Sequence, residues 1–325
     1  MARRINGTNG NDRIEQNGRP ELDIRAFGGK DTIILDRDDD LGGNNRVNAG
    51  DGNDTVLNTF EGGNVILLGK GNDIYIGTGF SQLGGFDIVE GGAGKDQFFL
   101  KTFKSVYRGG EGKDSFFSDG WQNDINGGGG SDTISYQFRH EDRVIGDTGV
   151  TIDLAAGAAQ TGAARFENLT SIENAIGSEH RDRIGGTDGR NVLTGLGGDD
   201  DIFGFGGKDV LIGGRGRDLL FGGSDADRFV FEKVADSTLA QQDRIADFNR
   251  ADGDIIDLSA IDAVAGRGNQ AFNFIGGDAF SGVAGQLRFS GDQLLGDVNG
   301  DGVADFAVEV DLDGQTPLQA SDFIL

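Results

Sequence analysis

The sequence predicts an all-β protein, in which a parallel β-roll with two short strands per coil is followed by a β-rich C-terminal domain. Two observations predict this fold class: a glycine-rich nonapeptide repeated in tandem, and longer alternating apolar and polar runs after residue 231. Residues 213–221 show the repeat most clearly, as G-G-x-G-x-D-x-U-x, where U is a large apolar residue. Self-similarity at a fixed period is the sequence signature of a repeat architecture.

Two places of the nine-residue unit keep their residue type through residues 177–231. The sixth place holds Asp182, Asn191, Asp200, Asp209, Asp218 and Asp227, and the eighth place holds Ile184, Leu193, Ile202, Leu211, Leu220 and Phe229. The glycines permit tight turns with positive φ, and the D-x-U-x half suits a three-residue strand with its apolar side chain on one side. We therefore expect coils of two units with the eighth-place side chains inside. A solvated glycine-rich linker would leave the apolar column unexplained.

The sixth-place carboxylates are candidate metal ligands. Coils that stack about 4.8 Å apart bring the carboxylates of successive coils close together. At roughly 5 Å and an effective dielectric near 20, two bare carboxylates repel by about 3 kcal/mol. A hard divalent cation removes this repulsion, and Ca²⁺ accepts both carboxylate oxygens and the main-chain carbonyls that a glycine turn can present. The repeat therefore predicts multiple Ca²⁺ ions along the turns.

This nonapeptide resembles the repeat of the RTX (repeats-in-toxin, haemolysin-type) calcium-binding family. The resemblance implies that each ion lies between turns one coil apart. Its ligands would be the second- and fourth-place carbonyls and the Asp of one unit, with the first- and third-place carbonyls and the Asp of the unit a coil later. On this basis Leu196, Gly198 and Asp200 would share an ion with Gly213, Arg215 and Asp218, and Phe205, Gly207 and Asp209 would share one with Gly222, Ser224 and Asp227. Further candidates in this block are Asp182, Gly195, Gly197, Gly204 and Gly206, whereas Asn191 implies a weaker or empty site.

A first block of repeats is expected over residues 1–135, opening with the unit of Asp12. Asp31, Asp54 and Asp73 lie in recognisable copies, but the spacings between them are not multiples of nine, which indicates loops inserted between coils. From Asp87 the nonapeptide register returns, with Asp96, Asp114 and Asp132 on one edge of the roll and Ser105 and Asn123 on the other. We expect calcium mainly along the Asp96 edge. The other candidate ligands of this block are Gly92, Gly94, Gly109, Gly110, Glu111, Gly112, Gly127 and Gly129.

Residues 136–176 interrupt the glycine repeat before the second block, residues 177–231. Residues 150–154 alternate between apolar and polar, which indicates a strand, and Leu169, Ile172 and Ile176 indicate a further strand and turn. The segment resembles the longer coil found between RTX blocks. We expect it to continue the roll.

Residues 232–325 are expected to form a separate domain. The patterns D-x-I-x-D-F at 243–248, D-x-I-D-L-S at 254–259 and the closing D-F-I-L at 322–325 resemble the C-terminal domain of serralysins. That resemblance implies an uncleaved C-terminal signal read by the type I secretion apparatus, and hence a secreted, extracellular protein. The alternative is an ordinary last strand. Residues 1–7 lack the apolar segment of a secretory signal peptide.

A different acidic motif lies within this domain. Asp297, Asn299, Asp301 and Asp305 spell D-x-N-x-D-G-x-x-D with Gly302, which matches the first nine positions of an EF-hand calcium loop. The twelfth place is Val308 rather than Glu, and the alternating residues that follow favour a hairpin over two helices. A bound cation and a plain Asx/Gly turn both remain open.

The composition excludes several classes of protein. The net charge is 29 − 54 = −25 and the basic residues form no cluster in the sequence, so nucleic acid is not expected as a partner. The absence of cysteine excludes disulfides and thiolate metal sites. The longest apolar run is residues 65–68, so no integral membrane segment is expected. An acidic, glycine-rich chain should stay disordered until it is neutralised, so that metal binding supplies folding free energy.

No catalytic motif accompanies these modules. The sequence contains no H-E-x-x-H and no G-x-S-x-G, and its two histidines, His140 and His180, cannot form a zinc protease site. We interpret the cluster of His140, Glu141 and Asp142 as a solvated loop. The leading hypothesis is a non-enzymatic calcium-binding protein that folds on extracellular calcium after type I secretion and then meets a cell surface, matrix or host. The alternative is the non-catalytic C-terminal part of a secreted metalloprotease, lipase or polysaccharide-modifying enzyme.

Overall fold

The computed structural model describes residues 2–36, 43–60, 62–79, 86–139, 149–162, 165–264, 266, 268–312 and 316–325. Across these ranges the regular structure is almost entirely β-strand, with two short 3₁₀ turns, η1 (Val234–Asp236) and η2 (Ala320–Asp322). The expected all-β class is therefore confirmed. The chain divides into two compact units, residues 1–146 with 156–174, and residues 147–155 with 175–325. The interruption of the repeat thus contributes to both units.

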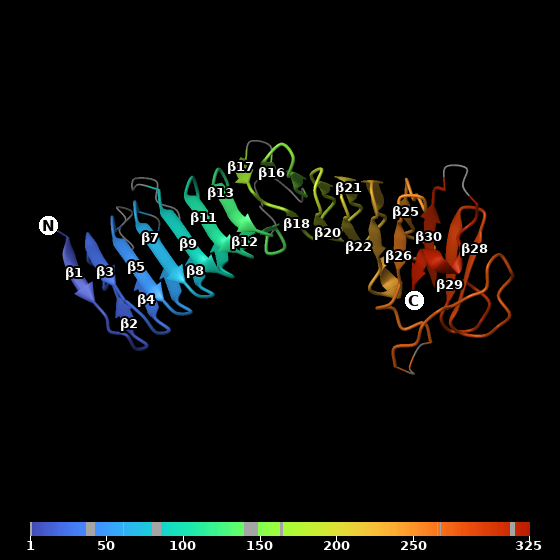
Figure 1. Ribbon diagram of the computed structural model, residues 1–325, viewed down its shortest axis with the longest axis horizontal. Helices are drawn as coiled ribbons and strands as arrows, with labels where there is room; N and C mark the ends of the chain where they lie inside the picture. The colour runs from blue at the N-terminus through green and yellow to red at the C-terminus, as the bar shows by residue number, and fades with distance from the viewer. Residues whose placement is uncertain are drawn as a thin grey trace. The chain divides into compact units, whose positions relative to one another are not determined.

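The first unit is a parallel β-solenoid, in which each coil gives one strand to each of two sheets. One sheet contains β1 (Arg3–Asn6), β3 (Leu22–Arg25), β5 (Arg46–Asp51), β7 (Val65–Lys70), β9 (Ile88–Gly94), β11 (Val106–Gly112), β13 (Asp124–Gly130), β17 (Arg165–Thr170) and the antiparallel β16 (Ala158–Gly162). The other contains β2 (Arg13–Glu15), β4 (Thr32–Leu35), β6 (Thr55–Asn58), β8 (Ile74–Gly77), β10 (Gln97–Leu100), β12 (Ser115–Ser118) and β14 (Thr133–Ser135). Figure 1 shows the strands of each sheet side by side in chain order, except that β17 lies between β13 and β16.

The registers between neighbouring strands show how the irregular spacing is accommodated. Thr32 pairs with Arg13 of the preceding coil and with Thr55 of the following coil, and both steps are longer than two nonapeptides. Between β10 and β14 each step equals two nonapeptides, as in the pairing of Phe98 with Phe116. The same alignment of apolar residues is kept throughout, so the additional residues of the longer coils lie outside the strands. This arrangement agrees with the inserted loops expected from the sequence.

The second unit continues with the same two-strand coil and then adds three consecutive antiparallel strands to its first sheet. Its first sheet contains β15 (Thr151–Asp153), β19 (Arg183–Gly185), β21 (Asp201–Gly206), β23 (Leu219–Ser224), β25 (Asp243–Ile245), β30 (Phe306–Val310), β29 (Gln293–Asp297), β28 (Gln286–Ser290) and β27 (Asn273–Phe274). Its second sheet contains β18 (Asn174–Ile176), β20 (Val192–Gly197), β22 (Val210–Arg215), β24 (Arg228–Val230), β26 (Ile255–Asp257) and β31 (Phe323–Ile324). The roll and the C-terminal segment therefore share both sheets.

The eighth-place residues form the core of both units, as the repeat predicts. Ile184, Leu193, Ile202, Leu211, Leu220 and Phe229 are fully buried. In the first unit aromatic residues enter the same column, and the rings of Phe98 and Phe116 stack with their centroids 4.6 Å apart. Tyr75 of β8 and Tyr107 of β11 meet across the core at 5.8 Å, so the two sheets enclose a single narrow core.

Candidate metal centre

The sixth-place residues lie at the turns, directly before the strands. In the first unit one edge carries Asp12, Asp31, Asp54, Asp73, Asp96, Asp114 and Asp132, which precede β2, β4, β6, β8, β10, β12 and β14. We call this the aspartate edge. In the second unit Asp182, Asp200 and Asp218 form one edge, and Asn191, Asp209 and Asp227 form the other. From Asp31 onward each of these residues is at most 2% exposed.

One carboxylate oxygen of each aspartate has a structural role. The main-chain N–H of Asp182 donates to Oδ1 of Asp200 at 2.7 Å, and the N–H of Asp200 donates to Oδ1 of Asp218 at 2.9 Å. The same bond joins Asp96 to Asp114 at 2.8 Å and Asp114 to Asp132 at 2.7 Å. Each bond links a turn to the turn one coil later. The side chains therefore form a hydrogen-bonded ladder along each edge, with one rung per coil.

The second carboxylate oxygen is buried without a protein partner. This holds for Oδ2 of Asp31, Asp54, Asp73, Asp96, Asp114 and Asp132 in the first unit, and of Asp200, Asp209, Asp218, Asp227 and Asp243 in the second. A buried carboxylate oxygen without a hydrogen bond or ion is strongly destabilising. A column of them has the chemistry of a hard-cation site, because Ca²⁺ selects anionic and carbonyl oxygens.

The first-place glycines show what else faces these oxygens. A Cβ on Gly195 would lie 2.1 Å from Oδ2 of Asp200 and 2.6 Å from the carbonyl oxygen of Gly213, one coil later. A Cβ on Gly204 would meet Oδ2 of Asp209 at 2.4 Å and the Gly222 carbonyl at 2.5 Å. Oxygens from two successive coils thus converge beside a glycine that leaves the space open, and a side chain there would fill it.

The same arrangement recurs in the first unit. A Cβ on Gly109 would lie 2.2 Å from Oδ2 of Asp114 and 2.5 Å from the carbonyl of Gly127. In the described part of the chain no group of three or more His, Asp or Glu side chains converges on one point. A bound ion must therefore take most of its ligands from main-chain carbonyls, and the donor set present fits Ca²⁺.

The second- and fourth-place carbonyls point along the stack. A Cβ on Gly214 would lie 2.1 Å from the Leu196 oxygen, and one on Gly216 would lie 1.7 Å from the Gly198 oxygen. Leu196 and Phe205 hold second-place conformations with φ of 85° and 76°, values that favour glycine. The third-place carbonyl of Arg215 accepts the N–H of Gly198 at 2.9 Å. The Arg215 carbonyl, one of the implied ligands, is therefore already engaged by a main-chain N–H.

Burial raises the pKa values of the aspartate carboxyl groups in the ladder. Desolvation, reinforced by the charges of Asp218 and Asp182, raises the pKa of Asp200 to about 9. Desolvation and the charge of Asp218 raise the pKa of Asp243 to about 9. Desolvation is also the main reason why the pKa values of Asp96, Asp218 and Asp227 rise to about 7. Without a cation, the fold therefore favours protonated carboxyl groups.

The metal-free chain is accordingly expected to be more structured at pH 5 than at pH 8. A carboxyl group with a folded pKa above its unfolded value stabilises the fold below the unfolded pKa, near 4. That contribution is lost as the pH rises through the folded pKa, about 7 for Asp218 and about 9 for Asp200. Circular dichroism in excess EGTA between pH 5 and pH 9 measures the effect. A β signal that grows with pH in EGTA would contradict it.

Some predicted ligands are satisfied by protein groups instead. Oδ2 of Asp12 accepts the N–H of Thr8 at 2.6 Å and its hydroxyl at 3.0 Å. Ser178 binds both oxygens of Asp182 in the corresponding turn, with its hydroxyl 2.9 Å from Oδ1. In both turns a hydroxyl residue replaces the second-place glycine. These hydroxyls complete the first turns of their edges, and this signal was readable in the sequence but was missed.

On the second edge of the first unit, protein groups donate hydrogen bonds to the buried acidic side chains Asp87, a predicted ligand, and Glu167. Asp87 accepts bonds from Asn64 N at 2.8 Å, Gly62 N at 3.1 Å and Asn58 Nδ2 at 2.5 Å. Further along, the buried Glu167 accepts hydrogen bonds from Ser118 Oγ at 2.9 Å, Asn123 Nδ2 at 2.7 Å and Tyr136 Oη at 2.9 Å. Amide and hydroxyl groups thus provide on this edge the polar partners that the aspartate edge lacks. Mainly one-sided calcium binding in this block stays a prediction.

Several residues that the sequence did not predict as metal ligands extend the ladders. Glu173 Oε2 accepts the N–H of Asp132 at 2.8 Å, and the Ser171 carbonyl takes the position that a first-place glycine holds elsewhere, 2.1 Å from a Cβ on Gly127. In the second unit Asp243 and Asp254 accept the N–H groups of Asp218 and Asp227 at 2.8 and 2.9 Å. The triplets Asp243-Arg244-Ile245 and Asp254-Ile255-Ile256 repeat D-x-U, so the sequence held a signal for both.

The EF-hand-like motif forms the turn of the β29–β30 hairpin. Asp297 is fully buried, and its two oxygens accept the N–H groups of Gly300 at 2.6 Å and Gly302 at 2.9 Å. Asp305 accepts Val298 N at 2.9 Å, and Asn299 and Asp301 each bond an N–H two residues on, at 2.8 Å. These bonds are those of nested Asx turns, and a cation there stays a prediction.

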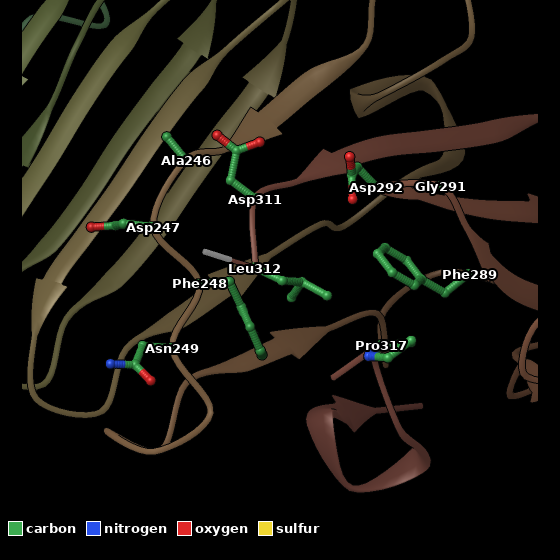
Figure 2. Close-up of a pocket in the computed structure, with 10 residues that line it drawn as sticks. All are labelled: Ala246, Asp247, Phe248, Asn249, Phe289, Gly291, Asp292, Asp311, Leu312 and Pro317. Carbon is green, nitrogen blue, oxygen red and sulfur yellow. The ribbon is translucent and has the colours of Figure 1, made fainter. Parts of the chain in front are cut away.

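A cavity of about 730 Å³ in the second unit combines an apolar lining with acidic residues (Figure 2). Phe248, Phe289, Leu312 and Pro317 supply the apolar lining. Asp247 accepts the N–H groups of Gly222 and Gly223, both at 2.9 Å, and Figure 2 shows its carboxylate directed away from Leu312. Asp292 and Asp311 also line the cavity, and Asp311 forms an ion pair with Arg244. His140, Glu141 and Asp142 lie outside the described residues.

Two family models match the chain, and one of them describes calcium-binding repeats. The family model for the peptidase M10 serralysin C terminal matches residues 124–325, and that for the RTX calcium-binding nonapeptide repeat matches residues 41–59 and 83–101. No curated protein matches the chain. Among solved structures, the solution structure of the AlgE6R3 subunit from the Azotobacter vinelandii mannuronan C5-epimerase is 27% identical, covers 45% of this chain and 78% of that chain, and has a TM-score of 0.32.

Proposed function

The chain belongs to the peptidase M10 serralysin C-terminal family, and from this membership we propose that it is a secreted, non-enzymatic protein that folds when it binds extracellular calcium. The observation that carries the proposal is the column of buried Oδ2 atoms without protein partners. The matched RTX calcium-binding repeats include Asp54 and Asp96 of this column. Bound Ca²⁺ would supply the positive charge and coordination that these oxygens lack.

By mass action, the occupancy of such a site depends on the calcium concentration of the compartment. Ca²⁺ sites in extracellular modules have dissociation constants of about 10⁻⁴ to 10⁻³ M. At a calcium concentration ten times the dissociation constant, each site stabilises the fold by about 1.4 kcal/mol, and far below that constant it contributes almost nothing. Several such sites suffice to switch a marginally stable fold between calcium-poor and calcium-rich surroundings.

The C-terminal tail is the proposed export signal. In the folded state Phe323 pairs with Ile256 in β26, and both oxygens of Asp322 accept bonds from Arg250, at 2.7 and 2.6 Å. The tail is therefore the last strand of the fold, and a signal role requires that the transporter reads it before folding. No helix among the described residues is long and apolar enough to cross a membrane.

Deleting residues 322–325 is expected to lower export through a co-expressed type I transporter at least tenfold, measured by quantitative blotting of medium and cells. The matched control is Arg250→Gln, which removes the folded partner of Asp322 and leaves the tail sequence unchanged. Export of this control should stay near the wild-type level. Equal losses in both variants would show that the tail acts only as a structural strand.

The family description also favours a second candidate, the non-catalytic part of a secreted enzyme. The calcium-binding role is common to both candidates. The genomic reading frame upstream of Met1 separates them, because an in-frame catalytic domain there would establish the second. Activity assays with the chain alone cannot replace this observation.

A further inference from the structure

A hollow of about 910 Å³ lies on the outer face of the first unit, over β1, β3, β5 and β7. The charged side chains that line it are Arg4, Asp23, Arg25, Arg46 and Asp51, and Nζ of Lys70 lies 3.2 Å from an oxygen of Asp51. Four cations thus accompany two carboxylates, which gives a local charge of 4 − 2 = +2 in a chain whose net charge is −25. The basic residues are scattered in the sequence, and only the strand registers bring them together.

Three arginines of this hollow share one carboxylate. Strand register places Asp23 between Arg4 and Arg46. Nε of Arg4 donates to Asp23 at 3.0 Å, and Nε of Arg25 donates to it at 3.4 Å. The hydrogen bond from Arg4, and then that from Arg25, lowers the pKa of Asp23. Arg46 forms no ion pair with any described residue, so positive charge remains unneutralised beside Asp23.

Protection of the sheet edge explains only part of this arrangement. Charged side chains on an edge strand hinder pairing with another chain, which accounts for Arg4 on β1. Arg25 and Arg46 lie on β3 and β5, which are paired on both sides and have no edge to protect. Farther along the same face, Glu90 and Arg108 neutralise one another in an ion pair of 3.1 Å. The excess of positive charge is therefore a property of the hollow, and the sheet itself does not require it.

An exposed aromatic ring also lines the hollow. Phe27 is 48% exposed and has a φ of 77°, a left-handed conformation that glycine adopts without strain. Gly50 holds the same place in the next coil, where a Cβ would lie 1.8 Å from the Phe27 oxygen. Phe205 shares the conformation of Phe27, but its ring packs 6.3 Å from that of Phe203. Phe27 contacts no other ring in the described part of the chain, so its half-exposed ring stays open to a ligand.

The spacing of these groups restricts the ligand. Arg4 and Arg46 lie two strands apart, which is roughly 10 Å, and guanidinium groups bind oxyanions through paired charge-assisted hydrogen bonds. Asp23 lies between them and, as a carboxylate, can only accept hydrogen bonds. The ligand must therefore carry hydrogen-bond donors between its anionic groups. Asn48, beside Arg25 in the register, adds an amide that both donates and accepts.

A saccharide with acidic groups meets all of these requirements. Its carboxylates or sulfates suit the arginines, its hydroxyls can donate to Asp23, and the apolar face of a sugar ring suits Phe27. The hollow also has the volume of a small-molecule site, about 300–1,000 Å³. We propose that this hollow binds an acidic saccharide, a role that goes beyond calcium binding.

Nucleic acid is a poorer fit to the hollow. DNA carries one phosphate about every 3.4 Å along each strand, so phosphates would lie against Asp23, and the DNA backbone offers no donor to that carboxylate. The net charge of the chain does not prevent the binding of an acidic saccharide, because charges more than about 8 Å away are largely screened at physiological ionic strength. Within that distance the positive charge of the hollow itself dominates.

Isothermal titration calorimetry of the full chain in 5 mM calcium chloride tests the proposal. Heparin hexasaccharide and hexagalacturonate probe sulfate and carboxylate groups separately, and maltohexaose is the neutral control. At least one acidic hexasaccharide should bind one-to-one with a dissociation constant below 1 mM, and maltohexaose should bind at least ten times more weakly. The tighter acidic probe identifies the anionic group. No binding of either acidic probe at 5 mM, or equally tight binding of maltohexaose or of a hexathymidylate, would overturn the proposal.

Substitutions locate the binding in the hollow. Arg46→Gln should raise the dissociation constant of the tighter probe at least about tenfold, because it removes a charge-assisted hydrogen bond. The charge-matched control Arg183→Gln should leave the constant unchanged, since Arg183 lies in the second unit over the ring of Phe203.

Phe27→Gly separates a ligand contact from a structural role. It should raise the dissociation constant at least about threefold, while the midpoint of urea unfolding in calcium does not fall, because glycine adopts the φ of Phe27 more readily. Circular dichroism in calcium verifies that each variant folds. A wild-type dissociation constant in Arg46→Gln or in Phe27→Gly would overturn the proposal.

Discussion

Removing calcium with excess EGTA at pH 7.5 is expected to abolish most of the β-sheet circular dichroism signal of the full chain. The aspartate edge stacks buried carboxylates along its length, with Asp31, Asp54 and Asp73 each hydrogen-bonded to its neighbour in the next coil. Each bare pair repels by about 3 kcal/mol at 5 Å and an effective dielectric near 20. Because folded domains are stable by only about 5–15 kcal/mol, a few unneutralised pairs exceed that margin.

Returning calcium to 5 mM should restore the signal in a cooperative transition, and native mass spectrometry should show several ions bound to the folded form. Mg²⁺ at the same concentration is the control. It demands a tight octahedral site and gives up its water reluctantly, so it should restore little structure. Substantial β structure in EGTA at pH 7.5 would contradict the proposed coupling of calcium binding to folding.

The period of the repeat was enough to predict the core. Eighth-place residues such as Leu211 and Leu220 are fully buried, because a strand of three residues can direct only one face inward. Because the inward-facing residue fixes each strand, the additional residues between Asp31 and Asp54 could be interpreted as an insertion outside the strands. The hydrogen bond from Asp31 N to Asp54 Oδ1 at 2.7 Å shows that the ladder is continuous across that coil.

The two roles of the aspartates could not be predicted from spacing. The sequence indicated a carboxylate at each rung, but not that Oδ1 is engaged by an N–H one coil away while Oδ2 is left for a cation. Glu173 was missed because it departs from the repeat, and its longer side chain reaches Asp132 from a turn of different length. Asp243 was missed because the glycine turn before it is absent, although its D-x-I triplet remains.

The difference in charge between the outer faces of the first unit was also beyond the sequence argument. The outward residues of β4, β6, β8, β10 and β12 carry no charge, whereas those of the other sheet include Asp23, Arg25 and Glu90. Outward positions were interpreted only as the exposed half of each strand. The contrast between the two faces depends on which sheet each strand joins and on the strand registers, which bring Ile34, Leu57 and Ile76 into one row although their coils differ in length. Only the assembled solenoid shows that row.

Replacing Asp200 separates its two roles, and the two substitutions are expected to differ. In Asp200→Asn the amide oxygen still accepts the N–H of Asp182, now 2.7 Å from Oδ1, but the charge beside the Gly213 carbonyl is lost. Calcium-dependent stabilisation should fall by about 1–3 kcal/mol, the effect of one site at ten to a hundred times its dissociation constant. The metal-free form should gain stability, because desolvation and neighbouring carboxylates raise the pKa of Asp200 to about 9.

Asp200→Ala removes the acceptor as well and leaves the buried N–H of Asp182 unpaired, which costs a further 1–3 kcal/mol or so with or without calcium. The charge-matched control is Asp201→Asn, since Asp201 lies outside the ladder and pairs with Arg181 at 3.3 Å on the surface. Urea unfolding of the three variants in calcium and in EGTA at pH 5 gives the free-energy differences needed. Wild-type calcium stoichiometry and midpoint in Asp200→Asn would show that Oδ2 is not a ligand. Equal free energies of unfolding for Asp200→Ala and Asp200→Asn in EGTA would show that the hydrogen bond from Asp182 contributes no stability.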